Sequence, residues 1–107
     1  MGLANWNIEA MTGYHPLTTF YTDFSIADGF NVEAIKDTYK RTFKEYKGQY
    51  KYLTELVMVL NWKCWEHYDK GNSQYSQLYQ DLYEKTDEYA LDHLKDEELS
   101  YYFRTTD

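Results

Sequence analysis

Residues 50–70 constrain the fold more than any other stretch, because they form a long apolar run without glycine or proline. Read as one helix at about 1.5 Å per residue, the run would span about 30 Å, the width of a small domain. One face would carry Leu53, Leu56, Val57, Leu60, Cys64, His67 and Tyr68, and the opposite face Met58, Val59, Trp62 and Trp65. A surface helix needs only one apolar stripe. The segment is therefore either the central helix of a bundle, or its second face docks a partner.

Further helices are predicted on both sides of this run. The expected N-caps are Thr18 or Thr19, Asn31, Ser73 and Asp96. The helix after Ser73 would bury a stripe made of Tyr75, Leu78, Tyr79, Leu82, Thr86, Tyr89, Ala90 and His93. Connections of two to four residues join antiparallel neighbours. The sequence therefore predicts an all-α fold: a compact antiparallel bundle of four main helices plus short terminal helices, with residues 1–10 as an N-terminal arm and residues 11–107 as a single helical domain.

The residue types indicate a single intracellular domain. The chain has 107 residues and one cysteine, Cys64, which excludes an internal disulfide and is expected in the core. We expect no signal peptide, because the N-terminus lacks a basic region followed by an apolar run. We also expect no membrane span, because the longest uncharged part of the apolar run is far shorter than about 20 residues. A cytoplasmic location follows. Thirteen tyrosines suggest many half-buried rings with the hydroxyl facing outward.

No catalytic, nucleotide-binding or metalloenzyme motif is present, so we expect no enzyme, no catalytic residue and no cofactor. His67 and His93 both fall on apolar faces of long predicted helices. If they met in the core, they would bind a metal together with Asp69 or Tyr89. A core histidine that is hydrogen-bonded to a tyrosine is the commoner arrangement, so we predict no metal site.

Charge is distributed unevenly along the chain, whose net charge is −7. The predicted second helix carries a basic stripe: Lys36, Lys40, Lys44 and Lys47. The predicted fourth helix carries an acidic face: Asp81, Glu84, Glu88 and Asp92. The stripe could follow a phosphate backbone, but the overall acidity makes a nucleic-acid partner unlikely. We expect instead that the lysines face the acidic helix or only increase solubility.

Three stretches, HPLTTFYTDFSIADGF (15–30), YKYLTELVMVLNWK (50–63) and ELSYYFRTTD (98–107), carry a resemblance to a known group. Over residues 11–107 the chain resembles small uncharacterised proteins of conjugative elements and phages of gut Firmicutes. The resemblance implies a bacterial cytoplasmic setting and an accessory role in a mobile element. It implies no functional residues.

Two functions are left open by these patterns. The first is a non-enzymatic accessory protein that binds another protein, or a second copy of itself, through Met58, Trp62 and Trp65. The second is an acidic, DNA-mimic-like inhibitor of a host restriction or CRISPR nuclease, acting through the acidic face. Exposure of the aromatic residues would favour the first.

Overall fold

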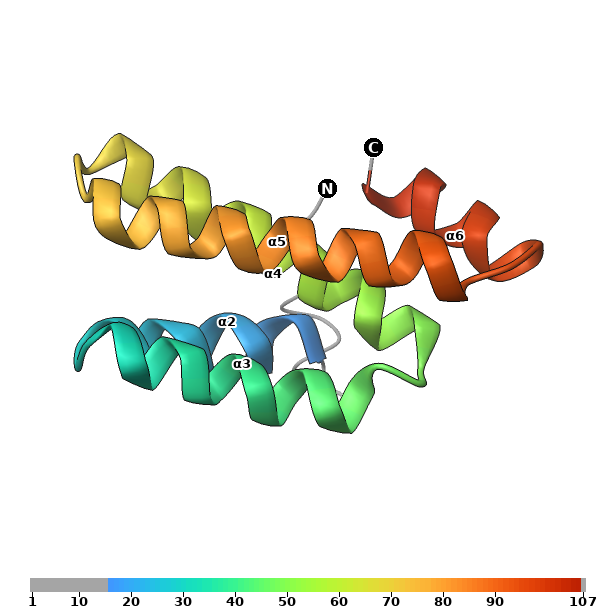
Figure 1. Cartoon of the computed structure of the whole chain (residues 1–107), viewed down its shortest axis with the longest axis horizontal. Coiled ribbons are helices and arrows are strands. Elements are labelled where there is room, and N and C mark those ends of the chain that lie inside the picture. Colours follow the sequence, from blue (N-terminus) through green and yellow to red (C-terminus); the bar gives the residue numbers. More distant parts are fainter. Residues whose placement is uncertain (1–15, 107) are drawn as a thin grey trace.

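The computed structural model describes residues 16–106, and all regular structure within this range is α-helical. The helices, labelled as in Figure 1, are α2 (Pro16–Asp28), α3 (Val32–Tyr46), α4 (Tyr50–Asp69), α5 (Ser73–His93) and α6 (Glu97–Thr106). The all-α prediction is confirmed. The predicted N-terminal arm, residues 1–10, lies outside the described residues.

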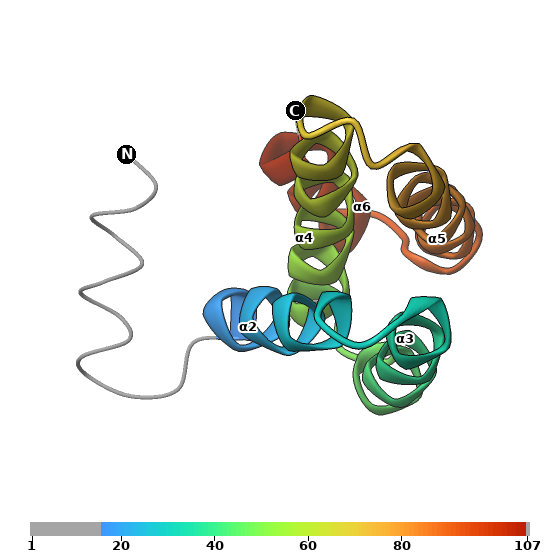
Figure 2. The ribbon, with the colours of Figure 1, turned by 90° about the vertical axis from the view of Figure 1, so that its left-hand side faces the viewer.

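The helices form two antiparallel pairs and a short closing helix (Figure 1). α2 and α3 make one pair, α4 and α5 make the other, and α6 folds back at the end of the second pair. α4 is the only described helix that packs against each of the other four. In Figure 2 it stands upright, with α2 across its lower end, α5 beside it and α6 behind it. The prediction that residues 50–70 form the central helix is confirmed.

Local sequence explains most of the helix ends. Asn31 caps α3 as predicted, because its Oδ1 accepts a hydrogen bond from the backbone N–H of Ala34 at 2.8 Å. Gly71 follows α4 with a φ of +79°, a left-handed conformation that glycine adopts without strain. Glu97 and Glu98 occupy the first turn of α6, where the positive end of the helix dipole stabilises carboxylates.

Two predicted caps are wrong. α2 begins at Pro16, so Thr18 and Thr19 lie inside the helix; a proline is well suited to the first helical position, where no N–H is needed. Ser73 is the first residue of α5, and the N-cap position belongs to Asn72. The Asn72 side chain makes no capping bond, because its amide instead contacts Nδ1 of His67 at 3.2 Å.

The core is aliphatic and aromatic, and it lies along α4. Leu53, Leu56, Val57 and Leu60 are completely buried or nearly so, as predicted for the first apolar face. Val59, from the second face, is also fully buried, in the cluster that contains Phe20 and Phe24 of α2. The second face is therefore partly covered within the subunit, by α2.

Several tyrosines differ from the expected arrangement, because their hydroxyls point inward. The Tyr79 hydroxyl donates to Oδ1 of Asp28 at 2.5 Å, and the Tyr102 hydroxyl donates to Asp87. Both rings are buried. A third tyrosine, Tyr21, donates to Oε2 of Glu66 at 2.5 Å. Each pair joins two different helices, so the hydroxyls connect helices instead of reaching water.

None of the described helices combines the length and the apolarity that crossing a bilayer requires.

Candidate functional site

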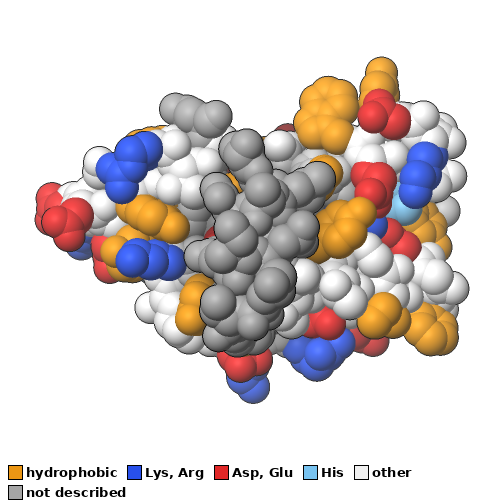
Figure 3. Space-filling model, turned by 180° about the vertical axis from the view of Figure 1, so that it is seen from behind, with side chains coloured by type: hydrophobic (Ala, Val, Ile, Leu, Met, Phe, Trp, Pro, Cys, Tyr) orange, Lys and Arg blue, Asp and Glu red, His pale blue; other side chains and the backbone are white. Residues whose placement is uncertain are grey.

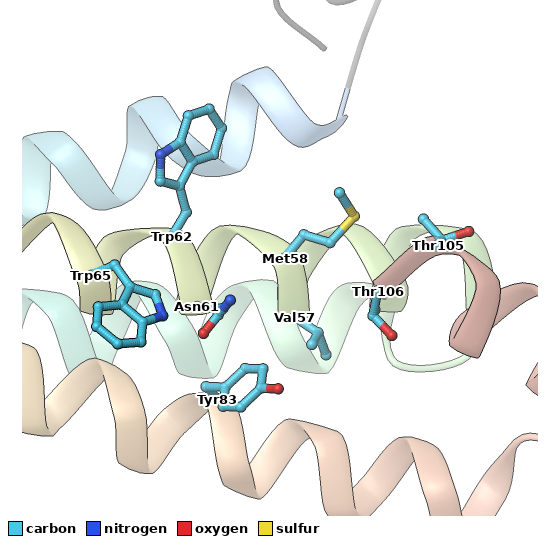
Figure 4. Close-up of a pocket in the computed structure, with 8 residues that line it drawn as sticks. All are labelled: Val57, Met58, Asn61, Trp62, Trp65, Tyr83, Thr105 and Thr106. Carbon is cyan, nitrogen blue, oxygen red and sulfur yellow. The ribbon is translucent and has the colours of Figure 1, made fainter. Parts of the chain in front are cut away.

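The surface beside α4 is hollowed, and residues of α5 and α6 complete the lining (Figure 4). A first hollow of about 380 Å³ is lined by Val57, Met58, Asn61, Trp62, Trp65, Tyr83, Thr105 and Thr106. A second hollow of about 310 Å³ shares Asn61, Trp65 and Tyr83 with the first and is extended by Cys64, Tyr68, Ser76 and Gln80. Because they share these lining residues, the two hollows lie next to each other, and together we name them the α4 groove. Each has the volume of a small ligand or side-chain pocket.

The three predicted partner-binding residues, Met58, Trp62 and Trp65, all line the first hollow. They differ in how far the body of the protein covers them. Met58 is half-buried, and Trp62, which is 37% exposed, points toward α2 and packs on the Tyr21 ring at 5.1 Å between centroids. Trp65 is 56% exposed. Of the predicted set, Trp65 is therefore the residue that presents the largest uncovered aromatic surface.

Tyr68 extends this aromatic surface along α4. It was expected on the buried face, but its side chain is 65% exposed and its ring contacts Trp65 edge-on at 5.5 Å. It lies in the last turn of α4, which ends at Asp69. In Figure 3, which views the molecule from the side of α2 and α4, hydrophobic side chains reach the surface between lysine and carboxylate side chains.

A buried polar network lies behind the groove, on the side of α4 that faces α2. Lys63 is only 2% exposed, although lysine is rarely buried unless it is paired. Its ammonium lies 2.7 Å from Oδ2 of Asp28, 2.5 Å from Oε1 of Glu66 and 3.2 Å from Oγ of Ser25. Nε2 of His67 contacts the same Asp28 oxygen at 2.9 Å. The network therefore joins the end of α2 to α4.

The charges of this network reinforce one another. Burial alone would lower the pKa of Lys63, but the carboxylates of Asp28 and Glu66 outweigh burial and raise that pKa. Burial would likewise raise the pKa of Glu66, yet hydrogen bonds from Lys63 and Tyr21 hold that pKa below its usual value. Lys63 is thus protonated at neutral pH and paired with the two carboxylates. An amine in this state is not suited to act as a nucleophile or as a general base.

Asp28, Glu66 and His67 each offer one potential metal-ligand atom, and these atoms lie within 4.8 Å of one another. The Lys63 ammonium already lies within hydrogen-bond distance of both carboxylates. A divalent ion would have to displace that ammonium. We therefore interpret the cluster as an internal ion-pair network that fixes α2 on α4.

The two histidines proposed as a metal pair do not meet. His67 packs against Tyr75 and Tyr79, in the first third of α5, whereas His93 is the last residue of α5, about 20 Å or more further along the helix. His93 is exposed and stacks on Tyr89 at 3.9 Å, so its assignment to the buried stripe is wrong. Asp69 is exposed as well. The hypothesis of a metal site built from His67 and His93 is therefore wrong.

Both charged surfaces lie where the pattern placed them. Lys36, Lys40, Lys44 and Lys47 are exposed on α3, and Asp81, Glu84, Glu88 and Asp92 are exposed on α5. Among residues 16–106, no ion pair joins the two sets; Lys36 pairs instead with Glu33 at 3.6 Å. Of the two alternatives for the lysines, ion pairing with the acidic helix is not seen in the described part of the chain, and both surfaces are exposed.

One exposed apolar region was not anticipated. Ile26 and Phe30, at the turn between α2 and α3, are 58% and 73% exposed and border a hollow of about 430 Å³ that also contains Asp23, Asp37 and Arg41. The sequence does contain one sign of this region: Phe30 directly follows Gly29 and does not fit the apolar spacing of the helix before it or of the helix after it.

Comparisons with protein-family models, with curated proteins and with solved structures find no match to this chain.

Proposed function

We propose that this protein is a non-enzymatic accessory protein that binds another protein through the α4 groove. The observation that carries the proposal is the gathering of Met58, Trp62 and Trp65 in one hollow, with Tyr68 continuing it. More than half of the surface of Trp65 and of Tyr68 is uncovered. Tryptophan and tyrosine are also the residues that most often dominate the energy of protein interfaces.

The size of the aromatic surface supports this function. A Trp or Tyr side chain buries about 150–250 Å² when it is fully covered. Covering the exposed half of Trp65 and of Tyr68 would remove on the order of 100 Å² each from water, or about 2.5 kcal/mol per residue at 25 cal/mol per Å². Two such residues are enough to form the centre of an interface, before any polar contact is added.

The lining of the groove favours binding over chemistry. The described residues that line it carry no carboxylate, amine or imidazole; their polar groups are the amides of Asn61 and Gln80, hydroxyls and the Cys64 thiol. Acid–base catalysis most often uses a histidine or a carboxylate positioned at the substrate, and neither is among these lining residues. The titratable cluster around Lys63 lies on a different side of α4, where its charged groups are paired with one another.

The mobile-element setting rests on the resemblance of residues 15–30, 50–63 and 98–107, and it stays a prediction. The same is true of the cytoplasmic location. A partner that belongs to the same conjugative element or phage would fit both.

Affinity capture with a matched control tests the proposed function. Tagged wild type, Trp65→Ala and Phe103→Ala would be used to capture proteins from the native host. Phe103, on α6, is 47% exposed and does not line the groove, so it controls for loss of any exposed aromatic. We expect a partner that is retained by wild type and Phe103→Ala and lost with Trp65→Ala. Identical captures by all three proteins would contradict the proposal.

Light scattering tests whether the partner is a second copy. A homodimer would give twice the chain mass of 13.0 kDa for wild type and a monomer for Trp62→Ala and Trp65→Ala. A monomer in every case would remove the homodimer and leave a different protein as the partner.

A second candidate function is favoured by one observation: Asp81, Glu84, Glu88 and Asp92 are all exposed on α5 and make no ion pair with the lysine stripe among the described residues. Such a surface could occupy the DNA site of a restriction or CRISPR nuclease. Reversing Glu84 and Glu88 to lysine should then abolish inhibition of that nuclease, while reversing the exposed Glu33 of α3 should not. Full nuclease activity in the presence of wild type would contradict this candidate.

A further inference from the structure

We propose that the occupant of the α4 groove is a basic amphipathic helix of about three turns, supplied by the partner. This inference rests on the proposed function and names the partner's chemistry. Three features of the groove support it: its length, the absence of a free backbone edge, and the sign of the surrounding charge.

The length of the groove matches a short helix. Its α4 wall extends from Val57 to Tyr68, which is about 16 Å at 1.5 Å per residue. A helix of about eleven residues has the same length. α6 closes one end through Thr105 and Thr106, and the exposed Tyr68 ring marks the other end.

The two hollows define where the partner's anchors would sit. Residues 57–65 of α4 line the first hollow and residues 61–68 line the second, so their middles lie about one helical turn apart. Side chains four residues apart on a helix have this same separation. The partner helix would therefore place two large apolar residues at positions i and i+4, one in each hollow.

A helical ligand also suits the chemistry of the groove walls. An extended peptide gains most of its affinity by adding a strand to a free sheet edge. The groove walls are the helices α4, α5 and α6, whose backbone N–H and C=O groups are bonded within the helices. Recognition must then come from side chains, and an amphipathic helix presents a compact apolar row to such a surface.

The charge around the groove selects a basic partner. α4 and α5 together carry eight acidic residues against three basic ones. Of the three, Lys63 is buried in its ion-pair network, and the ammonium groups of Lys51 and Lys85 lie over the rings of Tyr101 and Tyr39. Glu84 accepts a hydrogen bond from the lining residue Gln80 at 3.2 Å, and Asp69 lies one helical turn after the lining residue Trp65; both carboxylates are exposed. Lysine or arginine beside the apolar row would meet these carboxylates, whereas a second copy, at net charge −7, would be repelled.

Two synthetic peptides of fourteen residues test the proposal. Both carry leucine and tryptophan at i and i+4 on an alanine-rich helix; one has lysines and the other glutamates at the flanking positions. Binding would be measured by fluorescence polarisation to the full chain, to Trp65→Ala, to Glu84→Gln and to the control Phe103→Ala. Circular dichroism would establish that the variants fold.

We expect the lysine peptide to bind at least tenfold more tightly than the glutamate peptide. Binding should fall at least tenfold in Trp65→Ala, remain unchanged in Phe103→Ala, and weaken with added salt; Glu84→Gln should reduce the preference for lysine. Equal binding of both peptides, or tighter binding of the glutamate peptide, overturns the basic occupant. If such binding still depended on Trp65, the proposed function would stand. Binding of neither peptide overturns the helical occupant; the capture experiment tests the groove itself independently.

Discussion

Replacing Lys63 by methionine should destabilise the protein by about 3 kcal/mol, because it removes the cation from a buried ion-pair network. Methionine keeps much of the volume of the lysine stem, so the change acts mainly on charge. The variant leaves the carboxylates of Asp28 and Glu66 without the ammonium that lies 2.7 and 2.5 Å from them. Breaking a buried pair from one side costs about 3–5 kcal/mol. Asp28 and Glu66 keep their tyrosine donors, Tyr79 and Tyr21, and some access to water, which places the expected loss at the lower end of that range.

Urea denaturation followed by circular dichroism at pH 7 measures this loss. For a chain of this size, about 3 kcal/mol corresponds to a fall in melting temperature of roughly 12–24 °C. Lys36→Met is the matched control, because the Lys36–Glu33 pair has the same i, i+3 spacing as Lys63–Glu66 but is exposed; its loss should be about 0.5 kcal/mol or less.

A double variant, Asp28→Asn with Lys63→Met, separates the ion pair from general damage to the core. Because the two residues are in contact, their effects should not add, and the double variant should lose less than the sum of the two single losses. A loss below about 1 kcal/mol for Lys63→Met, with an unchanged denaturant slope, would refute the reasoning that the network fixes α2 on α4.

Three other predictions follow from the same structure. Asn31→Ala should destabilise the protein by about 1 kcal/mol, since it removes the side-chain acceptor at the start of α3, and urea denaturation measures the loss. Leu56→Ala should lower the free energy of unfolding by about 2–5 kcal/mol, because the Leu56 side chain is fully buried. Trp65→Ala should lower it by less than about 1 kcal/mol, because the Trp65 side chain is more than half exposed. Equal losses in the two variants would contradict the burial of these side chains. Hydrogen bonds from Lys63 and Tyr21 lower the pKa of Glu66 in the folded protein. The stability that these bonds add is present above pH 4.5, the ordinary pKa of the carboxyl group, and is lost as the pH falls below that value. The unfolding midpoints measured at pH 7, 5 and 3 should therefore decline less in Glu66→Gln than in wild type.

The helical framework could be predicted from spacing and capping residues. The long run with two apolar faces gave α4 its central place, and Asn31 gave the start of α3, because both depend on local properties of the chain. The errors at Ser73 and at Thr18 or Thr19 have one cause. A polar residue near a helix start can cap it, lie within the first turn or bond elsewhere, and only the tertiary partners decide which.

The candidate site could be predicted in part. Met58, Trp62 and Trp65 were placed on one face of a helix, and they share a hollow. Lys63 could not be recognised as buried, because helical spacing alone does not show that Asp28 of another helix reaches it. The contributions of α5 and α6 to the groove, through Tyr83 and Thr105, were missed for the same reason: they depend on how helices far apart in sequence pack.

The tyrosine–carboxylate pairs make the interior sensitive to alkali. Burial and a neighbouring carboxylate raise the pKa of Tyr79 and of Tyr102, and the bond to Glu66 raises that of Tyr21. Above the ordinary tyrosine pKa of 10, the unfolded chain releases the phenolic protons while the folded chain retains them. Strongly basic solution therefore favours the unfolded chain and destabilises the fold. Ultraviolet absorbance of phenolate during an alkaline titration would therefore rise in two stages, an early one from exposed rings and a late one that coincides with loss of the fold.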